Sequence, residues 1–245
     1  MAQWMRFVLD SGRVNGRRLV SAERFVDWLS PQVVVPPNAF YPAARLSRPH
    51  QITYGLGWFL HDYQGQSVAM HTGSIDGMIA IIGLIPDQRL GVYVLANADH
   101  AELRHALMYR VFDMYTSGVA RDWSTDLKAL YDGLQQQGKD AEAGLVKARV
   151  PGTRPSLELA RYAGTYADSL AGPLVITLEQ GRLRARLGAG FEGWLEHWHY
   201  DTFIGTWDDR RTGRSPLTFT IGASGAVATV TFDAAGQTLT FSRQP

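Results

Sequence analysis

The chain has 245 residues, of which 45% are hydrophobic and 19% charged, and its formal net charge is +1. This is the balance of a globular protein with one large or two ordinary domains, and it gives no indication of nucleic-acid or anionic-membrane binding. The absence of cysteine excludes disulfides, thiolate chemistry and Cys-ligated metal. The longest apolar runs, such as residues 78–85, are too short to span a bilayer, and residues 1–10 lack the pattern of a signal peptide.

The first elements are predicted to be helical. Residues 2–10 have apolar positions at helical spacing, and Gly12 ends the segment. Asn15-Gly16 predicts a turn, and Ser21 is expected to cap a second helix. The proline-rich segment from Pro31 to Pro49 shows no periodicity, so we expect a long surface loop of the kind that often borders binding sites.

Strands follow this loop. The alternation and the turn signals predict four antiparallel strands, at residues 54–61, 67–72, 78–85 and 90–96. The last two are continuous apolar runs, which is typical of strands covered on both faces. A helix is predicted from Asp99 to about Tyr115, because four apolar side chains form a stripe along it.

The second half changes in character. Residues 124–148 are predicted to be helical, and all three lysines lie in this region, which ends at Pro151-Gly152. We therefore expect a connector at 121–156 between domains at 1–120 and 157–245. Short strands with glycine-bearing turns then predict a small β-barrel or sandwich. The expected strands are 174–178, 182–187, 195–203, 217–221, 227–232 and 238–242. The fold class is α+β, with a small all-β domain.

The sharpest local motif is His71-Thr72-Gly73-Ser74, followed by Ile75-Asp76-Gly77. A glycine after a strand lets a ligand approach the backbone closely, and the neighbouring hydroxyls and imidazole are polar contacts. A backbone N–H in this segment could serve an oxyanion. The alternative is an ordinary glycine-rich hairpin, since short motifs recur by chance.

The wider context resembles one family, the β-lactamase-related serine hydrolases, which include class C β-lactamases, D-alanyl-D-alanine peptidases and esterases. The resemblance covers roughly residues 1–118, because several blocks occur in the family's order. These blocks are Tyr54-Gly55-Leu56-Gly57-Trp58, then His71-Thr72-Gly73, then Ile85-Pro86-Asp87, then Gly91 to Asn97. It implies a partial antiparallel sheet of the β-lactamase and transpeptidase type, with helices and no cofactor.

The resemblance also implies roles for the motif residues. His71 and Thr72 would contact the carboxylate or carbonyl side of the substrate, and Gly73 lies between them and Ser74. The Ser74 N–H would be one of two oxyanion-hole donors, the other being that of the nucleophile. The substrate would be a small-molecule amide or ester.

The family's other two motifs, Ser-x-x-Lys and Tyr-x-Asn, are absent. For the first of them, no serine has a lysine three residues later. Ser21 is followed at that spacing by Arg24, which stays protonated and cannot act as a base. Thr125 and Lys128 have the spacing but lie in the connector, and Tyr115-Thr116-Ser117 also follows the third motif. Without a nucleophile beside a base, acyl transfer has no start, so we predict a chain that is inactive alone.

In the family the two absent motifs lie upstream of a helix like residues 2–9. We therefore expect Met1 to be an internal start, an artificial boundary or the start of a truncated gene, and a complementing N-terminal half to be one partner. The complete protein would be periplasmic or secreted if it carries a signal peptide. The alternative function is a non-catalytic module that binds a ligand or forms homo-oligomers through its C-terminal barrel.

The C-terminal domain resembles the lipocalin-like barrel appended to some of these hydrolases, through Tyr162 to Tyr166, Leu195 to Phe203 and Thr240 to Arg243. Its aromatic residues, Trp194, Trp198, Tyr200, Phe203 and Trp207, are expected in the barrel core. Arg182, Arg184 and Arg186 alternate and predict a solvated outer face.

Three residues of the second domain have the pattern of a metal site. His197, His199 and Asp201 alternate, so they would share one face of a strand, and two imidazoles with a carboxylate can bind Zn²⁺. The alternative is a set of polar groups within the barrel's hydrogen-bond network. We favour this alternative, since no further ligand is suggested by spacing.

Overall fold

The computed structural model describes residues 1–245 except Asp76, 99–102, Ser117, 119–120, Ala189, 210–211 and 235–236. The chain divides into two compact units, Met1–Asp140 and Ala141–Pro245. The first combines helices with an antiparallel sheet and the second is a closed barrel, so the expected α+β class is confirmed.

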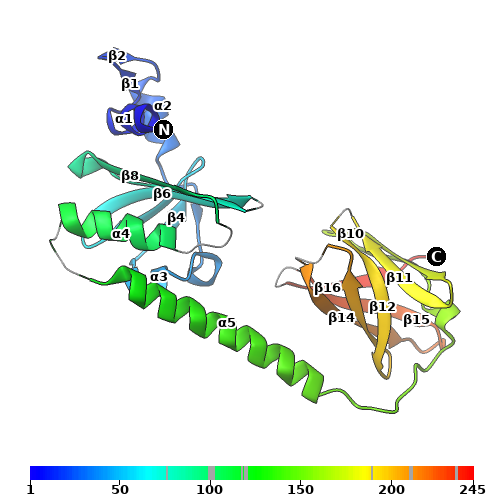
Figure 1. Ribbon diagram of the computed structural model, residues 1–245. Coiled ribbons are helices and arrows are strands. Elements are labelled where there is room, and N and C mark those ends of the chain that lie inside the picture. Colours follow the sequence, from blue (N-terminus) through cyan, green and yellow to red (C-terminus); the bar gives the residue numbers. More distant parts are fainter. Residues whose placement is uncertain are drawn as a thin grey trace. The chain divides into compact units, whose positions relative to one another are not determined.

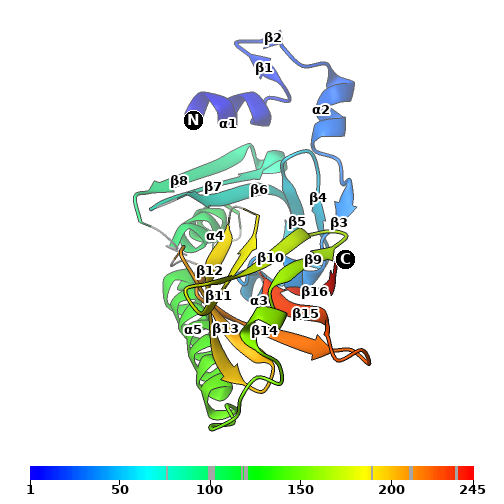
Figure 2. The same cartoon turned by 90° about the vertical axis from the view of Figure 1, so that its right-hand side faces the viewer.

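The first unit is built on a six-stranded antiparallel sheet in the order β3-β4-β5-β6-β7-β8, and Figure 2 shows these strands side by side. The strands are β3 (Val33–Val34), β4 (Ile52–Tyr54), β5 (Phe59–Tyr63), β6 (Gln66–Ile75), β7 (Met78–Ile85) and β8 (Leu90–Ala96). The predicted bounds of the last two are confirmed. β7 is largely buried, as its continuous apolar run predicts, whereas β8 is the edge strand and is only partly buried, with Leu95 66% exposed.

Helices cover both faces of this sheet. In Figure 1, α1 (Ala2–Leu9) and α2 (Ala22–Trp28) lie on one face and α4 (Leu103–Tyr115) lies on the other. The long helix α5 (Trp123–Lys147) begins on the α4 side, where Trp123 and Leu127 are buried in the core. The predicted helices at 2–10 and 124–148 are confirmed, whereas the predicted start at Asp99 lies outside the described residues.

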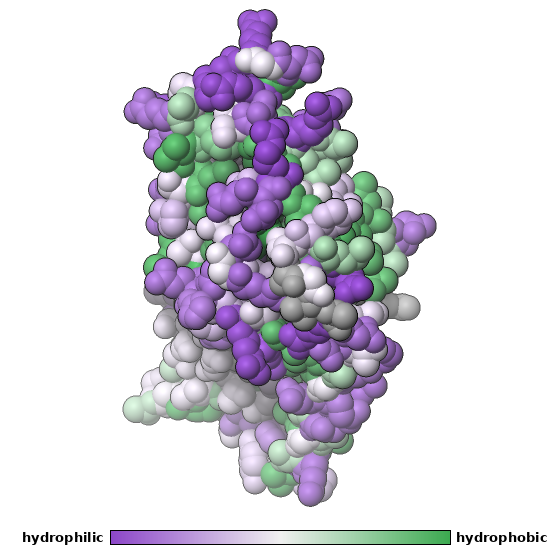
Figure 3. Space-filling model, turned by 90° about the vertical axis from the view of Figure 1, so that its left-hand side faces the viewer, coloured by the Kyte–Doolittle hydropathy of each residue, from purple (hydrophilic) through white to green (hydrophobic). Residues whose placement is uncertain are grey.

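The predicted turn and cap near the N-terminus are also confirmed. Asn15 and Gly16 have φ values of 51° and 80° and connect β1 (Arg13–Val14) to β2 (Arg17–Arg18). The Ser21 side chain accepts a hydrogen bond of 3.3 Å from the Arg24 amide at the start of α2. The tip formed by this hairpin is hydrophilic, as the upper end of the molecule in Figure 3 shows.

Two predictions for the first unit were wrong. The single strand expected at 54–61 is broken, because the chain turns at Gly57 with a φ of 92° and so forms β4 and β5. The segment 31–49 is not a plain surface loop: it contains β3, a 3-10 turn (η1, Pro37–Ala39) and the short helix α3 (Ala44–Ser47). Phe40 and Ala43 of this segment are buried, so it forms part of the core.

The second unit is a closed barrel of eight antiparallel strands, in which each strand pairs with its sequence neighbours and β9 closes the barrel between β10 and β16. The strands are β9 (Gly164–Asp168), β10 (Gly172–Glu179), β11 (Arg182–Leu187), β12 (Phe191–His199), β13 (Thr202–Trp207), β14 (Arg214–Ile221), β15 (Val227–Ala234) and β16 (Gln237–Arg243). The expected barrel is confirmed. A short turn, η3 (Leu159–Arg161), precedes it.

One strand prediction was wrong here as well. The segment 195–203 is not one strand, because the chain reverses at Tyr200 and Asp201 and so joins β12 to β13. Tyr200 has a φ of 45°, an unusual conformation for a residue other than glycine.

The aromatic residues of the barrel divide between its interior and its outside. Phe203 and Trp207 are buried in the interior, as predicted. Trp194 is not in the core, and the guanidinium groups of Arg182 and Arg184 lie over its ring at 4.8 and 4.9 Å. Tyr200 is exposed, and Trp198 is buried beneath the guanidinium of Arg149, which lies 4.6 Å from its ring centre. No helix among the described residues has the length and apolar character that a membrane span requires.

Candidate functional site

The motif His71 to Ser74 lies near the end of β6, where side chains alternate between the two faces of the sheet. Thr72 is buried on the side of α4, with 4% of its surface exposed, while His71 and Gly73 are exposed on the opposite face. The strand therefore presents an imidazole and a bare stretch of backbone to solvent on one face.

The motif also lies at an open edge. The neighbouring strand β5 pairs with β6 only as far as Met70, whereas β7 continues to pair with it as far as Ile75. Within the described strands, the motif thus has a partner on one side only. The Tyr41 hydroxyl donates a hydrogen bond of 3.3 Å to the Thr72 carbonyl.

Strand geometry then places the Ser74 amide. The N–H and C=O of one strand residue point to the same side, and residues two apart share that side. Because the Thr72 carbonyl accepts from Tyr41 and β5 does not reach this part of β6, we infer that the Ser74 N–H points to the side that β5 leaves open. The Ser74 N–H is the group that the sequence analysis predicts as an oxyanion donor.

The hydroxyl groups of the motif are already used. The Thr72 hydroxyl donates a hydrogen bond of 2.6 Å to the Ala80 carbonyl in β7, so in this conformation it serves the sheet. The Ser74 hydroxyl accepts a hydrogen bond of 2.8 Å from Arg104, whose guanidinium also lies 3.4 Å from the Gly73 carbonyl. Arg104 is buried, with 5% of its surface exposed, and holds the end of β6 from the side of α4.

Two aromatic rings surround the His71 imidazole. Phe59 is stacked with it at 6.0 Å between ring centres, and Tyr54 lies 6.2 Å from it. The rings fix one side of the imidazole and leave the other side exposed.

Sequence reasoning missed Tyr41 and Arg104. They lie about thirty residues from the motif on either side, in the proline-rich segment and in α4, and contact it only in the folded chain. The long segment at 31–49 was the one signal, because such loops often border a site.

The weaker nucleophile–base candidate in the connector has a structural explanation. The Thr125 hydroxyl donates a hydrogen bond of 2.8 Å to Asp122, at the start of α5. Lys128 pairs with Asp132 one helical turn further on. Neither side chain is directed to the other. The Ser117 candidate lies outside the described residues.

The three metal candidates also have protein partners. His197 Nε2 lies 2.9 Å from the Tyr200 carbonyl, and His199 Nδ1 accepts from the Val150 amide at 3.2 Å. The Asp201 carboxylate accepts from the Ser156 amide and hydroxyl at 2.9 and 2.7 Å and from the Tyr162 hydroxyl. Across the described part of the chain, no three His, Asp or Glu side chains are grouped to hold a metal ion.

These contacts attach the segment before the barrel to the β12–β13 turn. Burial raises the pKa of the Asp201 carboxyl, but the hydrogen bonds from Tyr162 and Ser156 outweigh it and hold the pKa below its ordinary value. Burial, together with the bond to Asp201, raises the pKa of Tyr162 to about 12.

Comparison with protein-family models gives two matches. Residues 1–113 match the family described as Beta-lactamase, and residues 148–244 match a domain of unknown function, DUF3471. Among curated proteins, the chain is similar to the unguisins hydrolase ungD of Aspergillus violaceofuscus, with 30% identity over 177 residues. The match takes in 68% of this chain and 30% of that relative, so the chain spans about a third of the relative's length.

The chain is also similar to several solved structures. The crystal structure of the C-terminal domain of penicillin binding protein Rv0907 is 31% identical, covers 40% of this chain and 95% of its own, and has a TM-score of 0.33. The octameric penicillin-binding protein homologue from Pyrococcus abyssi is 15% identical over 97% of this chain and 45% of its own, with a TM-score of 0.39. SurE is 18% identical over 92% of this chain and 43% of its own, with a TM-score of 0.32. By the family models, residues 1–113 are similar to the beta-lactamase family and residues 148–244 to the DUF3471 domain.

Proposed function

We propose that the first unit is the substrate-binding part of a serine hydrolase that cleaves small-molecule amides or esters. The observation that carries the proposal is the open edge of β6, where the Ser74 N–H faces away from β7 beside the exposed His71. The match of residues 1–113 to the family described as Beta-lactamase supports the reaction class.

Each motif residue has a role in this proposal. The Ser74 N–H donates to the oxyanion that develops when the substrate carbonyl is attacked, and one such donor is typically worth about 10²–10³ in rate. His71 contacts the carboxylate or carbonyl side of the substrate. Gly73 leaves room for the substrate, since a Cβ built on it meets no atom within 4 Å. Thr72 keeps the strand in place through its bond to Ala80.

The nucleophile and base of the reaction are not supplied by these residues. None of the serines has a lysine three positions on, and the described contacts of Thr125 and Lys128 do not bring them together. The 245 residues alone are therefore expected to be inactive, and activity would require a Ser-x-x-Lys segment from further sequence or from a complementing polypeptide.

A fluorophosphonate probe tests this directly. The purified chain is incubated with the probe and weighed intact, beside an active serine hydrolase as positive control. We expect no adduct on the chain and a stoichiometric adduct on the control. A stoichiometric adduct on the chain would show an activated serine among these residues and overturn the assignment.

The binding role needs its own test. When the chain is supplied with an upstream Ser-x-x-Lys segment, Gly73→Val should raise KM at least tenfold, because the side chain fills the open approach without meeting a neighbour. Gly133→Ala in α5, also without a neighbour within 4 Å, is the matched control and should leave KM unchanged. Equal KM values for both variants would remove β6 from the binding site.

A second candidate is a non-catalytic module, with residues 121–156 as connector between domains 1–120 and 157–245. The barrel interior is filled by buried side chains such as Tyr166, Phe232 and Phe241, so binding by this domain would use its outer surface. Leu170, 84% exposed in a turn held by Asp168, is the apolar side chain we would test first. Light scattering would report self-association that Leu170→Asp abolishes. A monomer at all concentrations would exclude the homo-oligomer.

A further inference from the structure

The segment between β3 and β4 borders a cavity of about 560 Å³. Its two ends meet, because the Val35 amide donates a hydrogen bond of 2.9 Å to the Ile52 carbonyl and Val34 pairs with Thr53. A compact surface loop with adjacent ends and packed side chains is an Ω-loop, a class that often carries function. The volume of the cavity falls in the range of small-molecule binding sites.

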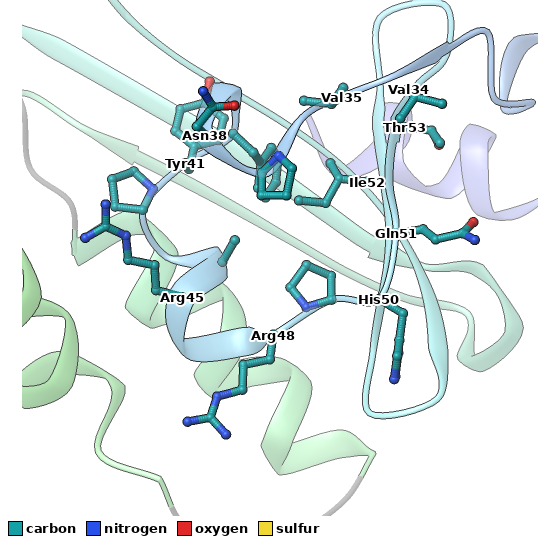
Figure 4. A pocket seen from close by; sticks show the side chains of 15 residues that line it. Val34, Val35, Asn38, Tyr41, Arg45, Arg48, His50, Gln51, Ile52 and Thr53 are labelled. Carbon is teal, nitrogen blue, oxygen red and sulfur yellow. The ribbon is translucent and has the colours of Figure 1, made fainter.

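The walls of the cavity are apolar. Figure 4 shows the Ile52 side chain of β4 directed into the space within the loop, and Val35 and Tyr41 of the loop also line the cavity. Phe40 and three prolines, Pro37, Pro42 and Pro49, add to these apolar walls, and the lining also includes the polar residues Asn38, His50, Gln51 and Thr53. Prolines restrict the backbone, so this lining changes little in shape and an apolar ligand would pay little to order it.

Contacts from outside the loop hold these walls. The Asp62 carboxylate accepts from the His50 amide at 2.7 Å and from the Gln51 amide at 3.3 Å, and its other oxygen lies 2.7 Å from His50 Nδ1. On the opposite wall, Arg121 donates to the Leu46 carbonyl of α3 at 2.9 Å. The second half of the loop is therefore held at α3 and just before β4.

The rim of the cavity is positively charged. Arg45 and Arg48 leave α3 together, and Figure 4 places both guanidinium groups at the outer rim of the loop. The lining contains no Asp or Glu. In the part of the chain that the structure describes, neither guanidinium forms an ion pair, whereas the nearby Asp62 is already bonded to His50. Two exposed guanidiniums beside an apolar hollow complement a ligand with an apolar body and one carboxylate.

We propose that this Ω-loop cavity binds amphipathic monocarboxylates, with the apolar body among Val35, Phe40 and Ile52 and the carboxylate at Arg45 and Arg48. The cavity shares Tyr41 with the β6 site, where the Tyr41 hydroxyl bonds the Thr72 carbonyl, but the proposed binding goes beyond the proposed hydrolase function. It needs neither the nucleophile nor the oxyanion donor.

The purified full chain tests the proposal by NMR titration with 4-phenylbutyrate. The neutral 4-phenylbutanamide keeps the apolar body without the charge, and acetate keeps the charge without the body. We expect saturable shifts of amides in residues 34–53 with phenylbutyrate, at least tenfold weaker binding of the amide, and no saturation with acetate. Equal affinity of acid and amide, or shifts elsewhere in the chain, would overturn the proposal.

Two variants separate the charge from the cavity. Arg45→Gln with Arg48→Gln should weaken phenylbutyrate binding at least tenfold and leave the amide unchanged, while Arg13→Gln with Arg17→Gln removes the same charge from the distant hairpin and should change neither. Ala44→Phe, on a half-buried lining residue, should weaken both ligands. Thermal unfolding checks that each variant is folded. If both arginine pairs behave alike, the rim arginines do not bind the carboxylate.

Discussion

The Trp123 indole donates a hydrogen bond of 2.6 Å to the Asp113 carboxylate, which joins the first residue of α5 to the last turns of α4. The Tyr63 hydroxyl donates to the other carboxylate oxygen at 2.5 Å. Asp113 is fully buried, so these bonds replace its lost hydration. Burial and the bond to Asp113 raise the pKa of Tyr63 well above its ordinary value. One carboxylate thus fixes α5 to the sheet.

Removing this carboxylate should loosen α5. Asp113→Ala leaves the Tyr63 hydroxyl and the Trp123 indole without their acceptor, and we expect a loss of about 2–4 kcal/mol in the free energy of unfolding, measured by urea titration. Asp132→Asn is the control, because Asp132 forms an exposed pair with Lys128 in the same helix and should change stability by less than about 0.5 kcal/mol. Similar losses in both variants would contradict the role of Asp113.

The buried His61 predicts a pH dependence of stability. Burial lowers its pKa to about 4, only partly opposed by the Asp62 charge, and its Nε2 lies 3.2 Å from the Tyr109 hydroxyl. Between pH 6.5 and 4 the unfolded chain takes up a proton that the folded site refuses, so the free energy of unfolding falls as the pH falls through this window. The largest loss is about 3 kcal/mol.

Urea titrations from pH 7.5 to 4 measure this loss. His61→Gln should flatten the pH profile over this window, while His71→Gln, at an exposed position, should leave it in place. A profile that His61→Gln does not change would assign the pH dependence to other groups.

Closure of the barrel depends on one glycine. A Cβ added to Gly193 in β12 would lie 2.2 Å from the Thr206 carbonyl oxygen in β13, and the next nearest atoms, at 2.8 Å, are also β13 backbone, which cannot move aside as a flexible side chain can. Gly193→Ala should therefore lower the free energy of unfolding of the second unit by more than about 3 kcal/mol. Gly190→Ala, three residues earlier with no atom within 4 Å, should be nearly neutral. Comparable thermal midpoints for the two variants would be inconsistent with the pairing of β12 and β13.

The Asp201 contacts predict both a stability effect and a metal response. Asp201→Ala leaves the buried Tyr162 hydroxyl without its acceptor and should cost about 1–3 kcal/mol, whereas Asp208→Ala at an exposed pair with Arg184 should cost less than about 1 kcal/mol. Because Asp201, His197 and His199 have protein partners, Zn²⁺ should not shift the thermal midpoint. A saturable zinc-dependent rise that Asp201→Ala abolishes would support the metal hypothesis instead.

Much of the fold could be predicted from local patterns. Three strands have the predicted bounds: 78–85, 90–96 and Arg182–Leu187. Continuous or alternating apolar residues are the sequence pattern that indicates a strand. The missed reversal at Tyr200 has no glycine or proline to signal it, and its left-handed backbone follows from contacts of Tyr200 and Asp201 with residues about forty-five positions earlier. The prolines in the segment 31–49 predicted a surface loop, so the burial of Phe40 within it was missed.

The candidate site also contains residues that could be predicted from the sequence and residues that could not. His71 to Ser74 were identified from the sequence because a motif is local. Tyr41 and Arg104 were not, because each contacts the motif only through tertiary structure. The hydrogen bond from the Thr72 hydroxyl to the Ala80 carbonyl could not be predicted either. It depends on which face of strand β6 is covered by helix α4.

The hydrogen bond between Val35 and Ile52 has a consequence for how this domain can vary. The loop between Val35 and Ile52 leaves the sheet and returns to it at the same position of the β3–β4 ladder. Its length can therefore change without shifting the register of β3 and β4. The entropy of closing the loop changes only with the logarithm of its length. Phe40 and Ala43 limit this freedom, because they fill the core beneath. A relative that shortens the loop must therefore supply another side chain to occupy the space under β4.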